Sequence, residues 1–147
     1  MKKDFRFLII DGYPKASRDQ FIDCGVSLAG ELYALLLLRH MPEAKYDIIY
    51  SSDPGTELPG KEELKNWNAI IWPGCNLTVY HTHDEKATKL VKLAKNGYLA
   101  GIPQFGSCWA AQLAVYAAGG DVQPNPKGRE MGEIGRASCR ERVFRTV

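Results

Sequence analysis

The chain has 147 residues, of which 45% are hydrophobic and 24% charged, and its formal net charge is +2. This length supports one domain with a single core and leaves no room for a second catalytic module. The last 12 residues carry four Arg and one Glu, so the rest of the chain has a net charge of −1 and offers no basic surface for nucleic acid. No apolar run approaches the roughly 20 residues that span a bilayer, and no signal-peptide pattern is present. We therefore expect a cytoplasmic protein with no membrane partner.

The cysteine and histidine patterns argue against a metal or redox centre. Four cysteines are scattered along the chain without any C-x-x-C pair: Cys24, Cys75, Cys108 and Cys139. This spacing gives neither a zinc ribbon nor a thioredoxin-type motif. His81 and His83 alternate near acidic residues, but Thr82 and Glu85 form a capping box at a helix start, which explains the segment. We predict no metal and no cofactor.

The first part of the chain predicts a strand followed by a long helix. Residues 5–11 (FRFLIID) form an apolar run that ends in a Gly-Tyr-Pro turn, which is typical of a buried strand. Asp11 and Tyr13 would lie at the carboxyl edge of the sheet, where we assign them a role in the turn. Residues 18–41 have helical spacing, with Cys24 as a packing residue. One face of this helix carries Phe21, Leu28, Leu32, Leu35 and Leu36.

The rest of the chain continues the alternation of strands and helices. Strands are predicted at residues 46–50, 68–72 and 102–105. Residues 84–96 carry apolar residues at helical spacing with Gly97 as a C-terminal cap, and residues 108–118 predict an apolar helix. This order predicts an α/β fold, with a three-layer flavodoxin-like or Rossmann-like parallel sheet and helices on both faces.

One predicted strand–turn–helix junction carries candidate chemistry. The stretch FGSCWAAQ at residues 105–112 joins a strand to a helix through small residues and presents Cys108 at the junction. Such a nucleophile elbow holds the thiol at the carboxyl edge of the sheet, and a helix N-terminus favours the reactive thiolate. We therefore predict that Cys108 is a catalytic nucleophile. The alternative is that Cys108 is a small buried hydrophobic residue.

Acyl transfer also needs hydrogen-bond donors for the developing oxyanion. Elbow folds take one donor from the amide that follows the nucleophile, here Trp109, and another from a neighbouring loop. The loop Pro73-Gly74-Cys75 follows a predicted strand and so lies at the same edge of the sheet. We predict that backbone amides of Gly74, Cys75 and Trp109 form the oxyanion hole.

Two of these segments resemble motifs of a known family. GSCWAAQ at residues 106–112 resembles the G-x-C-x-G-x-Q signature of class I glutamine amidotransferases, and WPGCN at residues 72–76 resembles their P-G-G oxyanion loop. The longer run at residues 106–132 is similar to a bacterial GMP-synthase-like branch of that family. The resemblance implies hydrolysis of the glutamine side-chain amide through a thioester on Cys108, with Gln112 near the substrate. Glutamine, and a synthetase domain or subunit that accepts the ammonia, are the implied partners.

Three departures from the family pattern bear on activity. Ala110 replaces the second glycine of the signature, and Cys75 replaces the second glycine of the oxyanion loop. The family completes its triad with a downstream His-x-Glu pair, and no histidine follows Cys108 in this chain. Losing the base of a serine-protease triad costs on the order of a million-fold in kcat, so we expect the 147-residue chain to be nearly inactive. The resemblance also implies that Arg129 and Glu130 line the substrate pocket.

The end of the chain reads differently from the rest. Residues 134–143 (IGRASCRERV) match a common short-read sequencing adaptor translated in one frame. We interpret residues 134–147 as adaptor read-through, in which Cys139 has no function, and residues 1–133 as the N-terminal portion of a class I glutamine amidotransferase domain, incomplete at its C-terminus. The alternative is a genuine basic tail for nucleic acid or anionic lipid.

Two other functions remain open on the sequence alone. One is a cysteine-elbow peptidase or deglycase of the same superfamily, although such an elbow usually has histidine directly after the cysteine, where this chain has Trp109. The other is a pseudo-amidotransferase that binds a metabolite or partner without catalysis. Gln112 favours the glutaminase, because an elbow built for glutamine keeps this residue.

Overall fold

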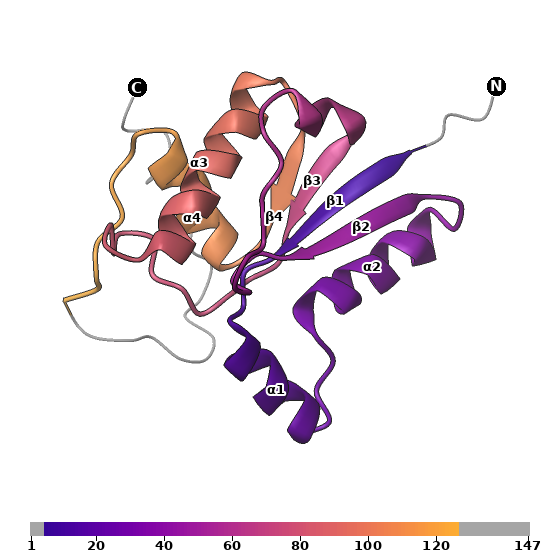
Figure 1. Cartoon of the computed structure of the whole chain (residues 1–147), viewed down its shortest axis with the longest axis horizontal. Helices are drawn as coiled ribbons and strands as arrows, with labels where there is room; N and C mark the ends of the chain where they lie inside the picture. The colour runs from indigo at the N-terminus through magenta and orange to yellow at the C-terminus, as the bar shows by residue number, and fades with distance from the viewer. Residues whose placement is uncertain (1–4, 127–147) are drawn as a thin grey trace.

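A computed structural model describes residues 5–126 and shows an α/β domain built on one parallel sheet (Figure 1). The four strands are β1 (Arg6–Asp11), β2 (Lys45–Tyr50), β3 (Ala69–Trp72) and β4 (Gln104–Gly106). They lie in the order β2-β1-β3-β4, with every neighbouring pair parallel. The domain limit predicted near Glu133, and the interpretations placed on Arg129, Glu130 and Cys139, fall outside the described residues.

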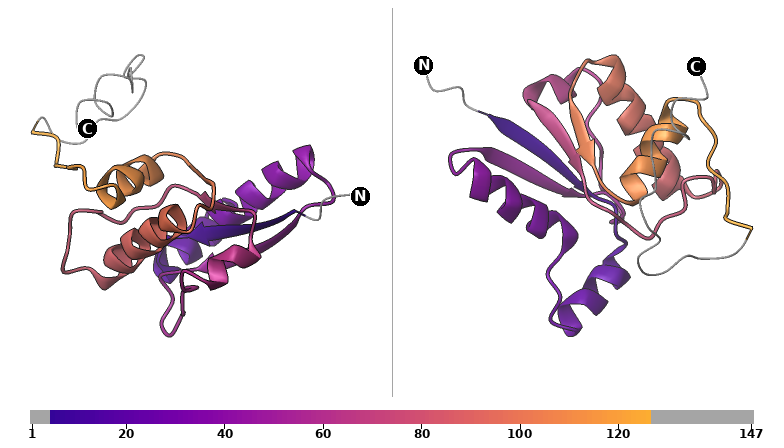
Figure 2. Two further views of the ribbon diagram at one scale, coloured as in Figure 1. Left: turned by 90° about the horizontal axis from the view of Figure 1, so that it is seen from above. Right: turned by 180° about the vertical axis from the view of Figure 1, so that it is seen from behind.

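Helices cover both faces of this sheet, as the predicted three-layer fold requires. They are α1 (Lys15–Asp23), α2 (Ala29–His40), α3 (Glu85–Leu99) and α4 (Trp109–Ala117), with a 3₁₀ turn η1 (Glu63–Asn66). Helix α2 packs on β1 and β2, while α3 and α4 pack together on the opposite face (Figures 1 and 2). Within residues 5–126 no helix has the length and apolar character needed to cross a membrane.

Alternating residues of the strands divide the core between the two faces. Leu8 and Ile10 of β1 are buried in the larger cluster, which also contains Leu90 of α3 and Leu113 of α4. Ile9, between them, points to the other face and packs with Ala34 of α2 and with Ile71. Residues of β3 alternate in the same way. Because both faces of the sheet are covered, successive central positions in these strands are apolar, which explains the continuous apolar runs in the sequence.

The single helix predicted over residues 18–41 is wrong, because the chain breaks into α1 and α2. Gly25 adopts φ +70°, and Leu28 is extended, so the helical path cannot continue between them. Cys24 lies at the end of α1 and is exposed, which corrects its assignment as a packing residue. The predicted apolar face assumed one continuous helix, so it does not exist as a single face. Three of its leucines are exposed on α2: Leu32, Leu35 and Leu36.

The predicted ends of α3 also need correction. The capping side chain is Asp84, which accepts a hydrogen bond from the amide of Lys86 at 2.9 Å, rather than Thr82. Gly97 is buried inside the helix, which continues to Leu99, and does not cap it. A Cβ at Gly97 would lie 2.9 Å from Ile70 Cδ1, so glycine here lets α3 approach the sheet closely.

A buried arginine fastens α1 to the sheet. Arg18 donates to the carbonyl of Tyr13 at 2.8 Å and makes two bonds to the Asp53 carboxylate at 2.7 and 2.8 Å. Its guanidinium also lies 4.2 Å from the centre of the Tyr50 ring. The hydrogen bonds join α1 to the loops that follow β1 and β2.

Replacing Arg18 by methionine is expected to destabilise the fold by about 2–3 kcal/mol, because charge-assisted hydrogen bonds are lost and Asp53 is left without this partner. Urea denaturation measures the change. Lys15→Met on the same helix is the matched control, since Lys15 and Asp19 form an exposed i,i+4 pair worth less than about 0.5 kcal/mol. Equal losses in the two variants would contradict the structural role of Arg18.

Candidate active site

Cys108 stands between β4 and α4 in a conformation that few residues adopt. Its φ is 56° and its ψ is −114°, and it is the one non-glycine residue with positive φ in the described part of the chain. Such backbone strain costs on the order of 1–3 kcal/mol and persists only where the surroundings hold it. The side chain is exposed, so the alternative of a buried packing residue is wrong.

Small residues make this sharp junction sterically feasible. A Cβ at Gly106 would lie 2.4 Å from the Cβ of Ala110, closer than such atoms approach, and 3.0 Å from that of Trp72, which is a very tight contact. Gly106 therefore provides the space between strand and helix, and a methyl group at Ala110 fits because Gly106 has none. The alanine that departs from the family signature is accommodated at this junction, which we call the elbow (residues 106–110).

Three loops meet at the carboxyl edge of the sheet. A Cβ at Gly74, after β3, would lie 3.2 Å from Cys108 Cβ and 3.7 Å from its sulfur. A Cβ at Gly12, after β1, would lie 3.1 Å from the sulfur of Cys75. The structure thus brings Gly74, Cys75 and Cys108 together, from segments that lie more than 30 residues apart in the sequence.

Cys75 differs from Cys108 in its environment. Its thiol is largely buried against the core, and burial raises the pKa of Cys75 to about 12, against a smaller opposing effect of a backbone hydrogen bond from Leu77. The thiol therefore stays protonated at neutral pH and is a poor nucleophile. The predicted role of Cys75 in an oxyanion hole involves its backbone amide and does not depend on this thiol.

The loop after β1 contributes a tyrosine to the same region. Asp11 is fully buried, and its carboxylate accepts hydrogen bonds from the amides of Tyr13 at 3.0 Å and Gly30 at 2.9 Å, so its predicted turn role is confirmed. Burial, followed by the proximity of the Cys75 and Cys108 thiols, raises the pKa of Tyr13. Its phenol therefore stays protonated and can donate a hydrogen bond beside the thiols.

Trp109 and Gln112 lie in the first turn of α4. Trp109 is buried, and its indole Nε1 has no partner among the residues of the structure that are described. Its backbone N–H lies at the start of the helix, where no residue one turn earlier in the helix can accept from it, so this amide can donate outward. Gln112 is exposed on the same turn.

Two polar contacts around the site join segments that are distant in sequence and were not anticipated. Tyr33 of α2 hydrogen-bonds to the Ser107 hydroxyl, although 74 residues separate them. Asn76, after β3, donates to the hydroxyl of Ser17 in α1 at 3.0 Å. No local spacing or motif relates either pair, so the sequence carried no signal for them.

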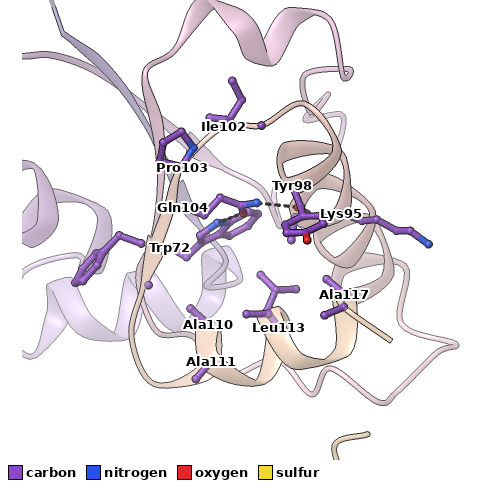
Figure 3. Close-up of a pocket in the computed structure, with 16 residues that line it drawn as sticks. Trp72, Lys95, Tyr98, Ile102, Pro103, Gln104, Ala110, Ala111, Leu113 and Ala117 are labelled. Atoms are coloured by element: carbon purple, nitrogen blue, oxygen red, sulfur yellow. Dashed lines mark hydrogen bonds between the residues drawn. The ribbon is translucent and has the colours of Figure 1, made fainter. Parts of the chain in front are cut away.

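One cavity lies behind the elbow and does not contain the thiol. It measures about 680 Å³ and is lined by β3, α3, β4 and α4, including Trp72, Gln104 and Leu113 (Figure 3). Gln104 accepts a hydrogen bond from the Trp72 indole at 2.8 Å and donates to the carbonyl of Ala94 at 2.9 Å. Its mostly apolar wall contains no cysteine, so the candidate site is the loop cluster around Cys108. Residues 5–126 hold no group of three or more potential metal ligands.

Similarity to known proteins agrees with this geometry. The class that the fold and the site define is a parallel α/β protein with a strained cysteine at a strand–helix junction. The chain is 32% identical over 125 residues to a gamma-glutamyl-L-1-hydroxyisopropylamide hydrolase of a Pseudomonas species, over 82% of this chain and 40% of that protein. It is 36% and 35% identical over 104 residues to the glutamine-hydrolyzing GMP synthases of Streptomyces avermitilis and Streptomyces coelicolor, over 70% of this chain and 18% of each synthase.

These similarities relate the chain to the class I glutamine amidotransferases. The chain spans less than half the length of each of these curated relatives. No family model matches the chain. No solved structure matches it either.

Proposed function

We propose that this chain carries the nucleophile of a glutaminase site, with Cys108 attacking the side-chain amide of glutamine. The strained backbone of Cys108 beside Gly74 is the observation that carries the proposal. Strain of this kind clusters at catalytic sites, where it holds a reactive group in place. The similarity to glutamine-hydrolyzing synthases supports glutamine as the substrate.

The proposed chemistry is acyl transfer to the thiol. The Cys108 thiolate forms a bond to the amide carbon, and the carbonyl electron pair moves onto oxygen, where the amides of Trp109 and the Gly74-Cys75 loop donate to it. Collapse of this intermediate breaks the C–N bond, and the protonated nitrogen leaves as ammonia. Water then attacks the glutamyl thioester, releasing glutamate and restoring the thiol.

Proton transfer in these steps needs a base that residues 109–147 do not offer, since they contain no histidine. The family resemblance assigns this role to a His-x-Glu pair, and we propose that the source gene encodes it. Gln112, exposed near the start of α4, is the proposed contact for the substrate. Sequencing the source gene through codon 133 tests whether the frame continues to such a pair.

Labelling with a thiol-reactive glutamine analogue tests the nucleophile directly. Incubation of the protein with the analogue at neutral pH, followed by peptide mass spectrometry, is expected to show one adduct on Cys108. Cys24 is exposed as well and serves as the internal control, because it lacks the surrounding loops. Labelling of Cys24 in place of Cys108, or no labelling, would contradict a glutamine-binding nucleophile.

A second candidate is hydrolysis of an N-substituted γ-glutamylamide. The observation that favours it is the similarity to the Pseudomonas gamma-glutamyl-L-1-hydroxyisopropylamide hydrolase, which extends over 82% of this chain. Both reactions form the same glutamyl thioester and differ in the amine that leaves. Comparing kcat/KM for glutamine with that for an N-alkyl γ-glutamylamide distinguishes them, because the better substrate identifies the leaving group that the site accepts.

The acceptor of the ammonia is the remaining part of the proposal. The two GMP synthase relatives support a synthetase domain or subunit in this role. Free thiols at Cys24, Cys75 and Cys108 fit action in the reducing cytoplasm. Ammonia release from glutamine by the full gene product would exclude the pseudo-amidotransferase, while peptide cleavage without glutamine hydrolysis would favour the peptidase.

A further inference from the structure

We propose that Tyr33 of α2 is a positioning residue for Cys108, acting through the hydroxyl of Ser107. This inference rests on the proposed function of Cys108 as the nucleophile. Tyr33 does not belong to the elbow or to the loops that surround the thiol, and it reaches the site from the opposite face of the sheet from α4.

Ser107 is held by three different elements. Its amide donates to the carbonyl of Trp72 in β3 at 3.3 Å, which is a long hydrogen bond, and its carbonyl accepts from Ala110 of α4 at 3.0 Å. Its hydroxyl pairs with the phenol of Tyr33. Among residues 5–126, Tyr33 is the hydrogen-bond partner of the Ser107 side chain, and the next residue along the chain is the strained Cys108.

The ring of Tyr33 supports the same junction. It packs against Phe105 of β4, with ring centres 6.5 Å apart. Phe105 itself is 61% exposed, so the strand end receives little other cover on this face. Tyr33 therefore contacts the chain on both sides of Gly106, through its ring before the glycine and through its hydroxyl after it.

The opposite side of Cys108 faces Gly74, where an added Cβ would make a tight contact of 3.2 Å with the Cys108 Cβ. The elbow is thus held between the β3 loop and α2. A left-handed non-glycine residue relaxes unless its neighbours fix it, and the Ser107 hydroxyl is the point where α2 does so. Losing this hydrogen bond releases Ser107 from α2 and lets the Cys108 thiol leave the position that the elbow gives it beside Gly74.

Alkylation of Cys108 by iodoacetamide tests this inference without requiring any glutamine recognition. Tyr33→Phe keeps the ring contact with Phe105 and removes the hydroxyl alone, and we expect the alkylation rate at Cys108 to fall about five- to tenfold, the effect of one hydrogen bond. Ser107→Ala should give the same loss, and the double variant no further loss, because both single changes break one shared bond. Ser107→Thr, which keeps a hydroxyl, should retain most of the rate.

Controls separate positioning from general damage to the fold. Tyr98→Phe makes the same chemical change at a residue that is 80% exposed and should leave the rate unchanged. The alkylation rate of Cys24 and the thermal midpoint should change little in every variant. An unchanged or increased rate at Cys108 in Tyr33→Phe, or additive losses in the double variant, would overturn the inference. Because iodoacetamide does not resemble glutamine, such a result leaves the outcome of the glutamine-analogue labelling unaffected.

Discussion

Replacing Cys108 by alanine is expected to abolish glutamine hydrolysis by the full gene product, with kcat falling on the order of a million-fold, as for the nucleophile of a comparable triad. In the proposed mechanism no thioester forms without the sulfur, and the proposed oxyanion donors alone give slow attack by water. Ammonia release in the presence of saturating glutamine measures the change. Cys24→Ala is the matched control, because this exposed thiol lies at the end of α1 and should leave kcat unchanged.

Replacing Cys108 by glycine is expected to change activity and stability in opposite directions. Cys108→Gly removes the nucleophile but relieves the positive φ, so we expect activity to vanish while stability rises by about 1 kcal/mol. Chemical denaturation measures the gain. Activity within tenfold of the wild type in either variant would exclude Cys108 as the nucleophile, and a loss of stability in the glycine variant would contradict the strain.

Adding one methyl group at Gly106 is expected to have the largest effect on stability. In Gly106→Ala the new Cβ would stand 2.4 Å from Ala110 Cβ, 3.0 Å from Trp72 Cβ and 3.1 Å from the Trp72 carbonyl oxygen. Because all three of these atoms belong to the backbone or are bonded directly to it, the strand and helix must separate, at a cost of about 3 kcal/mol. Urea denaturation measures this cost, and alkylation of Cys108 should slow because the elbow opens.

Two further variants show whether the contact itself is responsible. Gly106→Ala combined with Ala110→Gly removes the 2.4 Å contact and should recover part of the stability, since the contacts with Trp72 remain. Gly60→Ala is the matched control, because its nearest neighbour is a flexible carboxylate oxygen of Glu63 at 3.5 Å. If Gly106→Ala is as stable as Gly60→Ala, the close packing of the elbow is not a constraint.

Much of the fold was predictable because its signals are local. The strands at residues 46–50 and 68–72 lie within one residue of β2 and β3, since apolar runs bounded by turn residues mark buried parallel strands. The break between α1 and α2 was missed because a lone glycine inside a helical pattern is often tolerated, and only the φ of Gly25 shows that the helix stops. Gly97 was misassigned because its close contact with Ile70 joins two separate elements.

In the candidate site, too, the features that local sequence marks were predictable and those that depend on tertiary packing were not. Cys108 and the Gly74 loop stood out because a small-residue turn between strand and helix is written in consecutive residues, and the parallel sheet brings the strand ends together. The contact of Tyr33 with Ser107 depends on how α2 lies across the sheet, and the buried state of the Cys75 thiol depends on Gly12 and the core. These features follow from tertiary packing, which no local pattern encodes.

The way α1 is attached determines where native-state fluctuations concentrate. Its buried residue is Arg18, and the apolar Ile22 is 59% exposed, so polar contacts hold this helix more than core packing does. Segments with few buried apolar contacts open at lower free energy than core strands and exchange their amide hydrogens sooner. Ser17 of α1 bonds to Asn76 beside the Gly74 loop, so local opening of α1 releases the rim of the candidate site. We therefore expect the amide hydrogens of α1 to exchange sooner than those of the strands that lie beneath the candidate site.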